Sequence, residues 1–182
     1  MIANVSALVN ELRLRAETGR PVTIGLAGAG QMGTDIVVQL SLMPGLRLGA
    51  ISEVNVPNAI DAALLAGHAR EKIVNAKSAA EIDRAIEWGK LAITDDLNAL
   101  AGTGHIDVII DATGNPNTGT TLALDAIRNG KHVVMLNVEA DITIGRHLKA
   151  QAQSAGVVYT GAMGDEPACA IELIGFAQSL GL

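Results

Sequence analysis

The chain has 182 residues, a formal net charge of −6 and a hydrophobic content of 49%. The negative charge and the lack of a basic cluster argue against a nucleic-acid partner. The longest uncharged stretch, 150–164, is too short and too polar to span a bilayer. The N-terminus lacks the basic and apolar segments of a signal peptide, and a single cysteine permits no internal disulfide. We therefore expect a cytoplasmic protein.

The first third of the chain predicts a helix followed by a strand–helix–strand unit. Apolar residues recur at helical spacing between Val5 and Ala16, so 1–20 is expected to form an added helix. This helix is expected to pack on the sheet or on a neighbouring subunit. The next elements are expected in the order strand, turn, helix and strand, at 22–27, 28–33, 36–42 and 46–51.

Residues 28–33 read Gly-Ala-Gly-Gln-Met-Gly, which fits the G-x-G-x-x-G pattern of dinucleotide-binding turns. Gly28 permits the tight turn, Gly30 lets the backbone approach a pyrophosphate, and Gly33 lets the helix pack close to the strand. The N–H groups of that helix N-terminus would face the phosphates. The other residues of the turn are candidate cofactor contacts as well: Ala29, Gln31 and Met32. The alternative is a glycine-rich turn in another kind of α/β protein.

Glu53 lies after the second strand, about twenty residues beyond Gly33, where an acidic residue accepts hydrogen bonds from the adenosine ribose. A carboxylate at this place repels the 2′-phosphate of NADP, and no Lys or Arg follows at 54–56. The pattern therefore predicts NAD or NADP as the cofactor, with NAD favoured.

The remaining sequence continues the alternation of strands and helices. Helices are expected at 57–67, 78–88, 96–100, 117–128, from 141 or 143 to 155, and from about 166 onward. Strands are expected at 91–93, 107–111, 131–136 and 157–159. Ser78, Thr94 and either Asp141 or Thr143 are the expected caps. About six strands separated by helices predict an α/β fold with a doubly wound parallel sheet of the Rossmann type, in the order 3-2-1-4-5-6. We expect one cofactor-binding domain over 1–182.

Two further loops should reach the carboxyl edge of the sheet beside the glycine turn. Ala112, Thr113 and Gly114 follow the fourth strand, where small residues would let the nicotinamide ribose approach, although ordinary turns have the same composition. Asn137 follows the fifth strand and is expected to hydrogen-bond the cofactor or the substrate. Glu139 is either an acid–base group or a favourable charge near a helix N-terminus.

Other reactive residue types have structural interpretations. Asp165 is expected to cap the final helix, with a role in the site left open. The four histidines share no metal-ligand spacing and are interpreted as surface or structural residues. Cys169 is interpreted as a small packed side chain in the last helix. The sequence therefore predicts no metal site, and it identifies no catalytic residue.

Four segments together resemble one known family. They are Gly-Ala-Gly-Gln-Met-Gly at 28–33, Asp-Ala-Thr-Gly at 111–114, Asn-Val-Glu-Ala-Asp at 137–141 and Gly-Asp-Glu-Pro at 164–167. The chain resembles the N-terminal half of homoserine dehydrogenase-like oxidoreductases. The branch it resembles most includes 1-deoxy-D-xylulose 5-phosphate reductoisomerase-like enzymes, often with a SAF domain. The resemblance implies that the substrate domain, with most catalytic groups, is absent from this chain.

The primary hypothesis is the cofactor-binding domain of an NAD(P)-dependent oxidoreductase that acts on a small hydroxy or carbonyl compound. We expect the nicotinamide dinucleotide and a small-molecule substrate as partners, in a homo-oligomer. Full-length enzyme activity is expected, and the chain alone is expected to be inactive. The alternative is a non-catalytic NAD(P)-binding or redox-sensing module. A third hypothesis is a transferase that binds adenosylmethionine at the same glycine turn.

Overall fold

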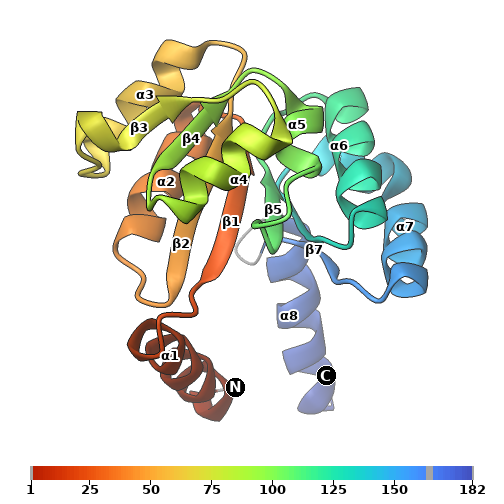
Figure 1. Ribbon diagram of the computed structural model, residues 1–182. Coiled ribbons are helices and arrows are strands. Elements are labelled where there is room, and N and C mark those ends of the chain that lie inside the picture. Colours follow the sequence, from red (N-terminus) through yellow and green to blue (C-terminus); the bar gives the residue numbers. More distant parts are fainter. Residues whose placement is uncertain (1, 163–165, 182) are drawn as a thin grey trace.

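Parallel strands form one sheet in the order β3-β4-β2-β1-β5-β6-β7 (Figure 1). The computed structural model describes residues 2–162 and 166–181. The strands are β1 (Val22–Ala27), β2 (Leu46–Ser52), β3 (Ile73–Asn75), β4 (Leu91–Thr94), β5 (Val108–Asp111), β6 (His132–Met135) and β7 (Tyr159–Gly161). Without β3, this is the order 3-2-1-4-5-6 expected from the sequence, so the doubly wound α/β prediction is confirmed.

The edge strand β3 was missed, and the reason is its length. It has three residues, of which only Ile73 is buried, and it follows a single 3-10 turn at Arg70–Lys72. So short a segment shows no alternation of apolar and polar residues over the length that a sequence pattern needs. It pairs with β4 in register, from Ile73 opposite Leu91 to Asn75 opposite Ile93.

Helices cover both faces of the sheet (Figure 1). An apolar cluster lies between the sheet and the helices on each face. Helices α2 and α3 pack on one face, and α4 to α7 pack on the other. The sheet core is aliphatic, as in parallel sheets that are buried on both faces. The helices are α1 (Ile2–Glu17), α2 (Gln31–Ser41), α3 (Val56–Leu65), α4 (Ala79–Glu87), α5 (Leu97–Ala101), α6 (Pro116–Arg128), α7 (Val138–Ala155) and α8 (Glu166–Ser179).

The helix caps correct two of the expected boundaries. Ser78 caps α4 as expected, since its hydroxyl accepts a hydrogen bond from the N–H of Glu81. Asp96, not Thr94, caps α5, because Thr94 belongs to β4 and its hydroxyl accepts from the N–H of Asp96 instead. The cap of α7 is Asn137, whose Oδ1 accepts from the N–H of Ala140. The proposed caps Asp141 and Thr143 therefore lie inside α7.

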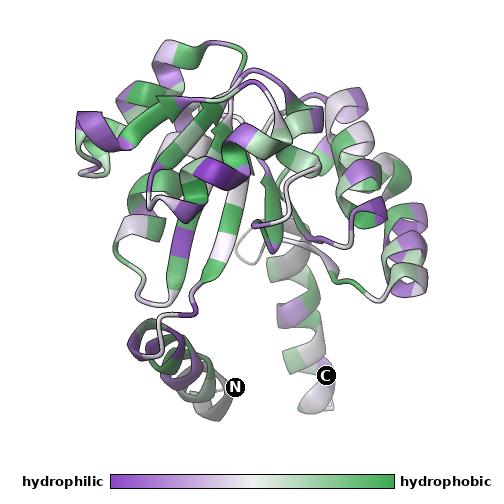
Figure 2. Cartoon of the chain, viewed as in Figure 1, coloured by the Kyte–Doolittle hydropathy of each residue, from purple (hydrophilic) through white to green (hydrophobic). Residues whose placement is uncertain are grey.

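The terminal helices α1 and α8 extend away from the sheet (Figure 1). The added N-terminal helix is confirmed. Of its two expected packing surfaces, the sheet is not used, because Leu8 is 59% exposed, and packing on a neighbouring subunit stays a prediction. The contact of α1 with the domain is made where the Leu12 backbone approaches Gly45. In α8, Ile171 is 70% exposed, and Figure 2 shows how little of this helix is hydrophilic. The interpretation of Cys169 as a packed side chain is also wrong, since Cys169 is exposed.

The expected cap Asp165 lies outside the described residues. In the part of the chain that the structure describes, every helix is too short or too polar to cross a bilayer.

Candidate functional site

The glycine turn after β1 is held by close backbone contacts that only glycine permits. Gly28 has φ +92°, and a Cβ there would lie 2.6 Å from the carbonyl oxygen of Ala112. A Cβ on Gly33 would lie 2.1 Å from the carbonyl oxygen of Gly28. Gly30 differs, because a Cβ there would meet nothing within 4 Å and would point into open space. The first and last glycines therefore shape the turn, and Gly30 leaves its outer side free.

A cleft of about 330 Å³ opens at this turn, at the carboxyl ends of β1, β2, β4 and β5. This is the edge at which open α/β sheets bind their ligands. Helix α2 begins here at Gln31, after its N-cap residue Gly30, and no side chain caps its N-terminus. The N–H groups and the positive end of the helix dipole are thus available to an anion. The cleft is lined by Gly28, Gly30, Ser52, Glu53, Val54, Asp95, Leu97, Ala112, Thr113, Asn115 and Thr118.

Glu53 is fixed at the rim of the cleft by two backbone donors. Its Oε2 accepts a hydrogen bond from the N–H of Ala29 at 2.6 Å, and its Oε1 accepts from the N–H of Asn55 at 2.9 Å. Its own N–H donates to the carbonyl of Thr94, which places Glu53 beside the residue after β4, Asp95. Asp95 was not predicted from the sequence. Its position directly after a buried strand was the available signal.

The loop after β5 forms the other wall of the cleft. Thr113 is half-buried and Gly114 is exposed with φ +68°. The hydroxyl and N–H of Thr113 both donate to Asp111 Oδ1, at 2.7 Å and 2.9 Å. Asp111 is 0% exposed, and burial raises the pKa of its carboxyl, against the smaller lowering effect of the nearby donor groups of Thr113 and Asn137. Asp111 was not predicted from the sequence to be a site residue.

Asn137 and Glu139 occupy different environments at the start of α7. Asn137 is 1% exposed, and its Nδ2 donates to the carbonyl of Asn115 at 2.8 Å. Its amide therefore ties the β5–α6 loop to α7, and the expected contact with a ligand stays a prediction. Glu139 is exposed in the first turn of α7 and does not line the cleft, which favours its interpretation as a helix-terminus charge. Gln31 and Met32 are exposed on α2, while Ala29 is buried.

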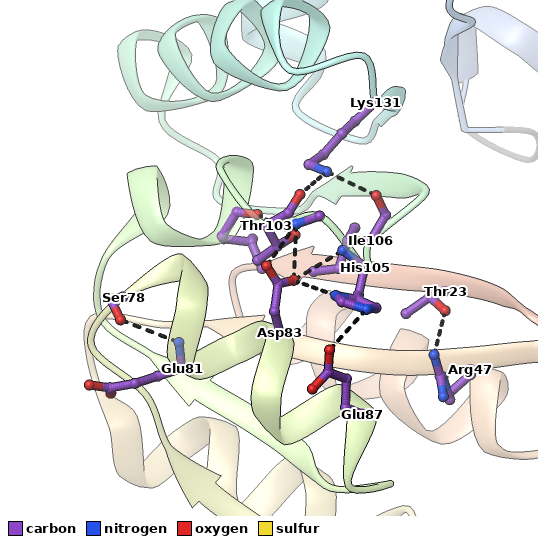
Figure 3. Close-up of polar contacts among 12 residues, drawn as sticks. Thr23, Arg47, Ser78, Glu81, Asp83, Glu87, Thr103, His105, Ile106 and Lys131 are labelled. Atoms are coloured by element: carbon purple, nitrogen blue, oxygen red, sulfur yellow. Dashed lines mark hydrogen bonds and ion pairs between the residues drawn. The ribbon is translucent and has the colours of Figure 1, made fainter.

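A second polar cluster lies at the opposite, amino-terminal edge of the sheet (Figure 3). Here His105 contacts Asp83 and Glu87, and the buried Lys131 donates to the carbonyls of Thr103 and Ile106. These residues join loops and helices and are remote from the glycine turn. Among the described residues, no group of three or more His, Cys, Asp and Glu side chains is arranged to hold a metal ion.

Comparison with known proteins gives the family. The model of the family "Homoserine dehydrogenase, NAD binding domain" matches residues 28–160, which span the sheet from the glycine turn to β7. The chain belongs to this family. A homoserine dehydrogenase from Pseudomonas aeruginosa is 30% identical over 139 residues, which are 76% of this chain and 28% of that protein. The expected resemblance is confirmed, while the likeness to the SAF-domain branch stays a prediction.

Solved structures share the fold at low identity. A homoserine dehydrogenase from Thiobacillus denitrificans gives a TM-score of 0.55 at 22% identity, over 78% of this chain and 29% of that one. A scyllo-inositol dehydrogenase from Lactobacillus casei, solved with bound NAD(H), gives 0.57 at 17% identity, over 79% and 36%. The chain spans 25% and 28% of the two curated homoserine dehydrogenases that it matches. Its family binds a nicotinamide dinucleotide, and the residues of the glycine turn fit such a ligand.

Proposed function

We propose that the cleft binds NAD in preference to NADP, with the pyrophosphate at the N-terminus of α2 and the adenosine ribose at Glu53. The observation that carries this proposal is the position of Glu53, whose carboxylate is bonded to the Ala29 N–H within the glycine turn. A ribose diol can donate hydrogen bonds to this carboxylate. A 2′-phosphate would instead meet a fixed negative charge, and none of the described residues lining the cleft is Lys or Arg.

The cofactor would extend from Glu53 at the end of β2, past the glycine turn of β1, to Thr113 beyond the end of β5. The sheet order β2-β1-β5 supports this path, because these three strands are neighbours. The nicotinamide dinucleotide supplies the hydride chemistry when bound. This chain would bind and orient it, and we propose that hydride transfer involves a small hydroxy or carbonyl compound in a homo-oligomeric, cytoplasmic oxidoreductase.

Calorimetric titration with NAD, NADP and adenosylmethionine tests the proposal. The wild-type chain is expected to bind NAD about tenfold more tightly than NADP, a difference of about 1.4 kcal/mol. Glu53→Gln should reduce this preference, since it removes the charge and keeps the shape of the side chain. Asp61→Asn, on the exposed side of α3, is the matched control for the loss of one negative charge.

Each outcome of this titration decides between hypotheses. Binding of adenosylmethionine without either dinucleotide would replace the oxidoreductase proposal by the transferase alternative. An unchanged NAD-to-NADP ratio in Glu53→Gln would remove the role given to Glu53. NAD binding without turnover, in a longer chain that carries any substrate domain, would favour the redox-sensing module.

A further inference from the structure

Asp111 is a buried carboxyl group that cofactor binding, as proposed above, does not use. It is the last residue of β5 and pairs in register with Ala27 at the end of β1, so it lies directly behind the glycine turn. No cation contacts it among the described residues, and its Oδ2 has no hydrogen-bond partner there. A buried polar group kept at this cost needs a reason beyond packing.

Asp111 fixes the direction of one hydroxyl in the cleft. Its Oδ1 accepts hydrogen bonds from both the N–H and the hydroxyl of Thr113. A threonine hydroxyl can donate one hydrogen bond, and that of Thr113 donates to Asp111. The direction of this bond is the same in both charge states of Asp111, because a proton on the carboxyl would occupy the free Oδ2. The Thr113 oxygen is therefore left as an acceptor at the wall of the cleft.

The first N–H groups of α6, which an anion could otherwise use, are already capped by a side chain. Asn115 Oδ1 accepts from the N–H groups of Asn117 and Thr118, both at 3.1 Å, at the N-terminus of α6. Asn137 Nδ2 donates to the carbonyl of Asn115 at 2.8 Å and, at 3.4 Å, to the Thr113 hydroxyl oxygen, which keeps a second lone pair for a ligand. A ligand group at Thr113 must therefore donate a hydrogen bond, as a hydroxyl does and a fully ionised phosphate does not.

We infer that Asp111 is a positioning residue that holds the Thr113 hydroxyl as an acceptor for a hydroxyl of the second ribose of the bound dinucleotide, the ribose attached to nicotinamide. This inference rests on the proposed function, which places that ribose beside β5. At Thr113, the preference for a sugar hydroxyl over an anion would therefore depend on Asp111, a side chain that the ligand does not touch. Thr113 makes the contact, and Asp111 acts through it.

Titrations with ADP, ADP-ribose and NAD isolate the contribution of the second ribose. ADP contains the first ribose and the pyrophosphate, and ADP-ribose adds the second ribose. In the wild type, we expect the added ribose to increase affinity. Thr113→Val and Asp111→Ala should each reduce the ratio of ADP-ribose to ADP affinity by about fivefold, the usual strength of one hydrogen bond. Affinity for ADP itself should stay unchanged.

Conservative variants separate positioning from a purely structural role. Thr113→Ser keeps the hydroxyl and Asp111→Asn keeps an acceptor oxygen, so both should retain the wild-type ratio. An equal loss of ADP and ADP-ribose affinity in Asp111→Ala would overturn the inference, because it would indicate general damage to the site. Should Asp111→Ala not fold, an unchanged ratio in Thr113→Val would overturn it alone. Failure of the wild type to bind NAD and ADP would overturn the proposed function as well.

Discussion

Three glycines around the cleft stand where a side chain would collide with the atoms that shape it. Gly28 and Gly33 approach backbone carbonyls, as the dinucleotide pattern predicted. Gly119, in α6, was not singled out by any motif. A Cβ there would lie 2.2 Å from Asp111 Oδ2 and 2.7 Å from Asn137 Nδ2. The positions of Asp111 and Asn137 behind the cleft wall thus require a residue without a side chain at 119.

We predict that Gly119→Ala destabilises the fold by about 1–3 kcal/mol, because the buried Asp111 and Asn137 side chains have no free space to move into. This loss should exceed the gain in helix propensity of about 1 kcal/mol. Gly175→Ala in α8 is the matched control, since a Cβ there meets nothing within 4 Å, and it should be neutral or stabilising. Urea unfolding followed by circular dichroism measures both. Equal midpoints for the two variants would contradict the crowding at Gly119.

At the scale of elements, Asp83 joins α4 to the loop before β5 (Figure 3). Its carboxylate accepts from the N–H groups of Gly104 and His105 and contacts the His105 ring at 3.1 Å. Burial alone would raise the pKa of Asp83, but the hydrogen bonds from Gly104 and His105 outweigh it and lower this pKa below 3.8. The folded state therefore favours the ionised carboxylate of Asp83. The hydrogen bonds to this carboxylate stabilise the fold at pH values above 3.8.

We predict that Asp83→Asn lowers the free energy of unfolding by about 1 kcal/mol at pH 7. A lowered folded-state pKa means that this stabilisation is present above the unfolded value of 3.8 and is lost as pH falls through the folded value. The difference between wild type and variant should therefore shrink below pH 4 or so. Glu87→Gln, which touches only the exposed side of His105, is the control. A difference independent of pH would contradict the role of the charge.

The elements that the sequence predicted are those whose signals are local. The glycine turn, the Ser78 cap and the end of α7 at 155 each depend on a few adjacent residues, and Gly156 follows that helix end with φ +72°. The cap of α7 was misplaced because Asn137, Asp141 and Thr143 are all common capping residues, and only the fold decides which one meets a free N–H. The close approach of Asp111 to Gly119 joins β5 to α6. No sequence pattern predicts this approach.

At the scale of the whole molecule, helices cover both faces of the sheet, whereas most of the described side chains of α1 and α8 are exposed. Across the described residues, the large apolar side chains of α8 lie in water: Ile171, Leu173, Ile174 and Phe176 are all more than half exposed. An apolar surface of this extent on a helix favours association in water. The expected homo-oligomer stays a prediction, and α8 offers a surface on which to test it.

We predict that the purified chain associates in a concentration-dependent way and that Leu173→Glu weakens this association about tenfold or more, because it places a charge in an apolar contact. Leu65→Glu in α3 is the matched control. Leu65 is 70% exposed and Leu173 is 69% exposed, but Leu65 lies on a helix that packs on the sheet and not on α8. Sedimentation velocity over a range of concentrations measures both variants, and NAD titration of each confirms that the cleft is intact. A monomeric wild type, or equal weakening by the two substitutions, would exclude α8 as the associating surface. Loss of association in Leu173→Glu alone, with NAD binding unchanged, would show that cofactor binding and assembly use separate ends of the molecule.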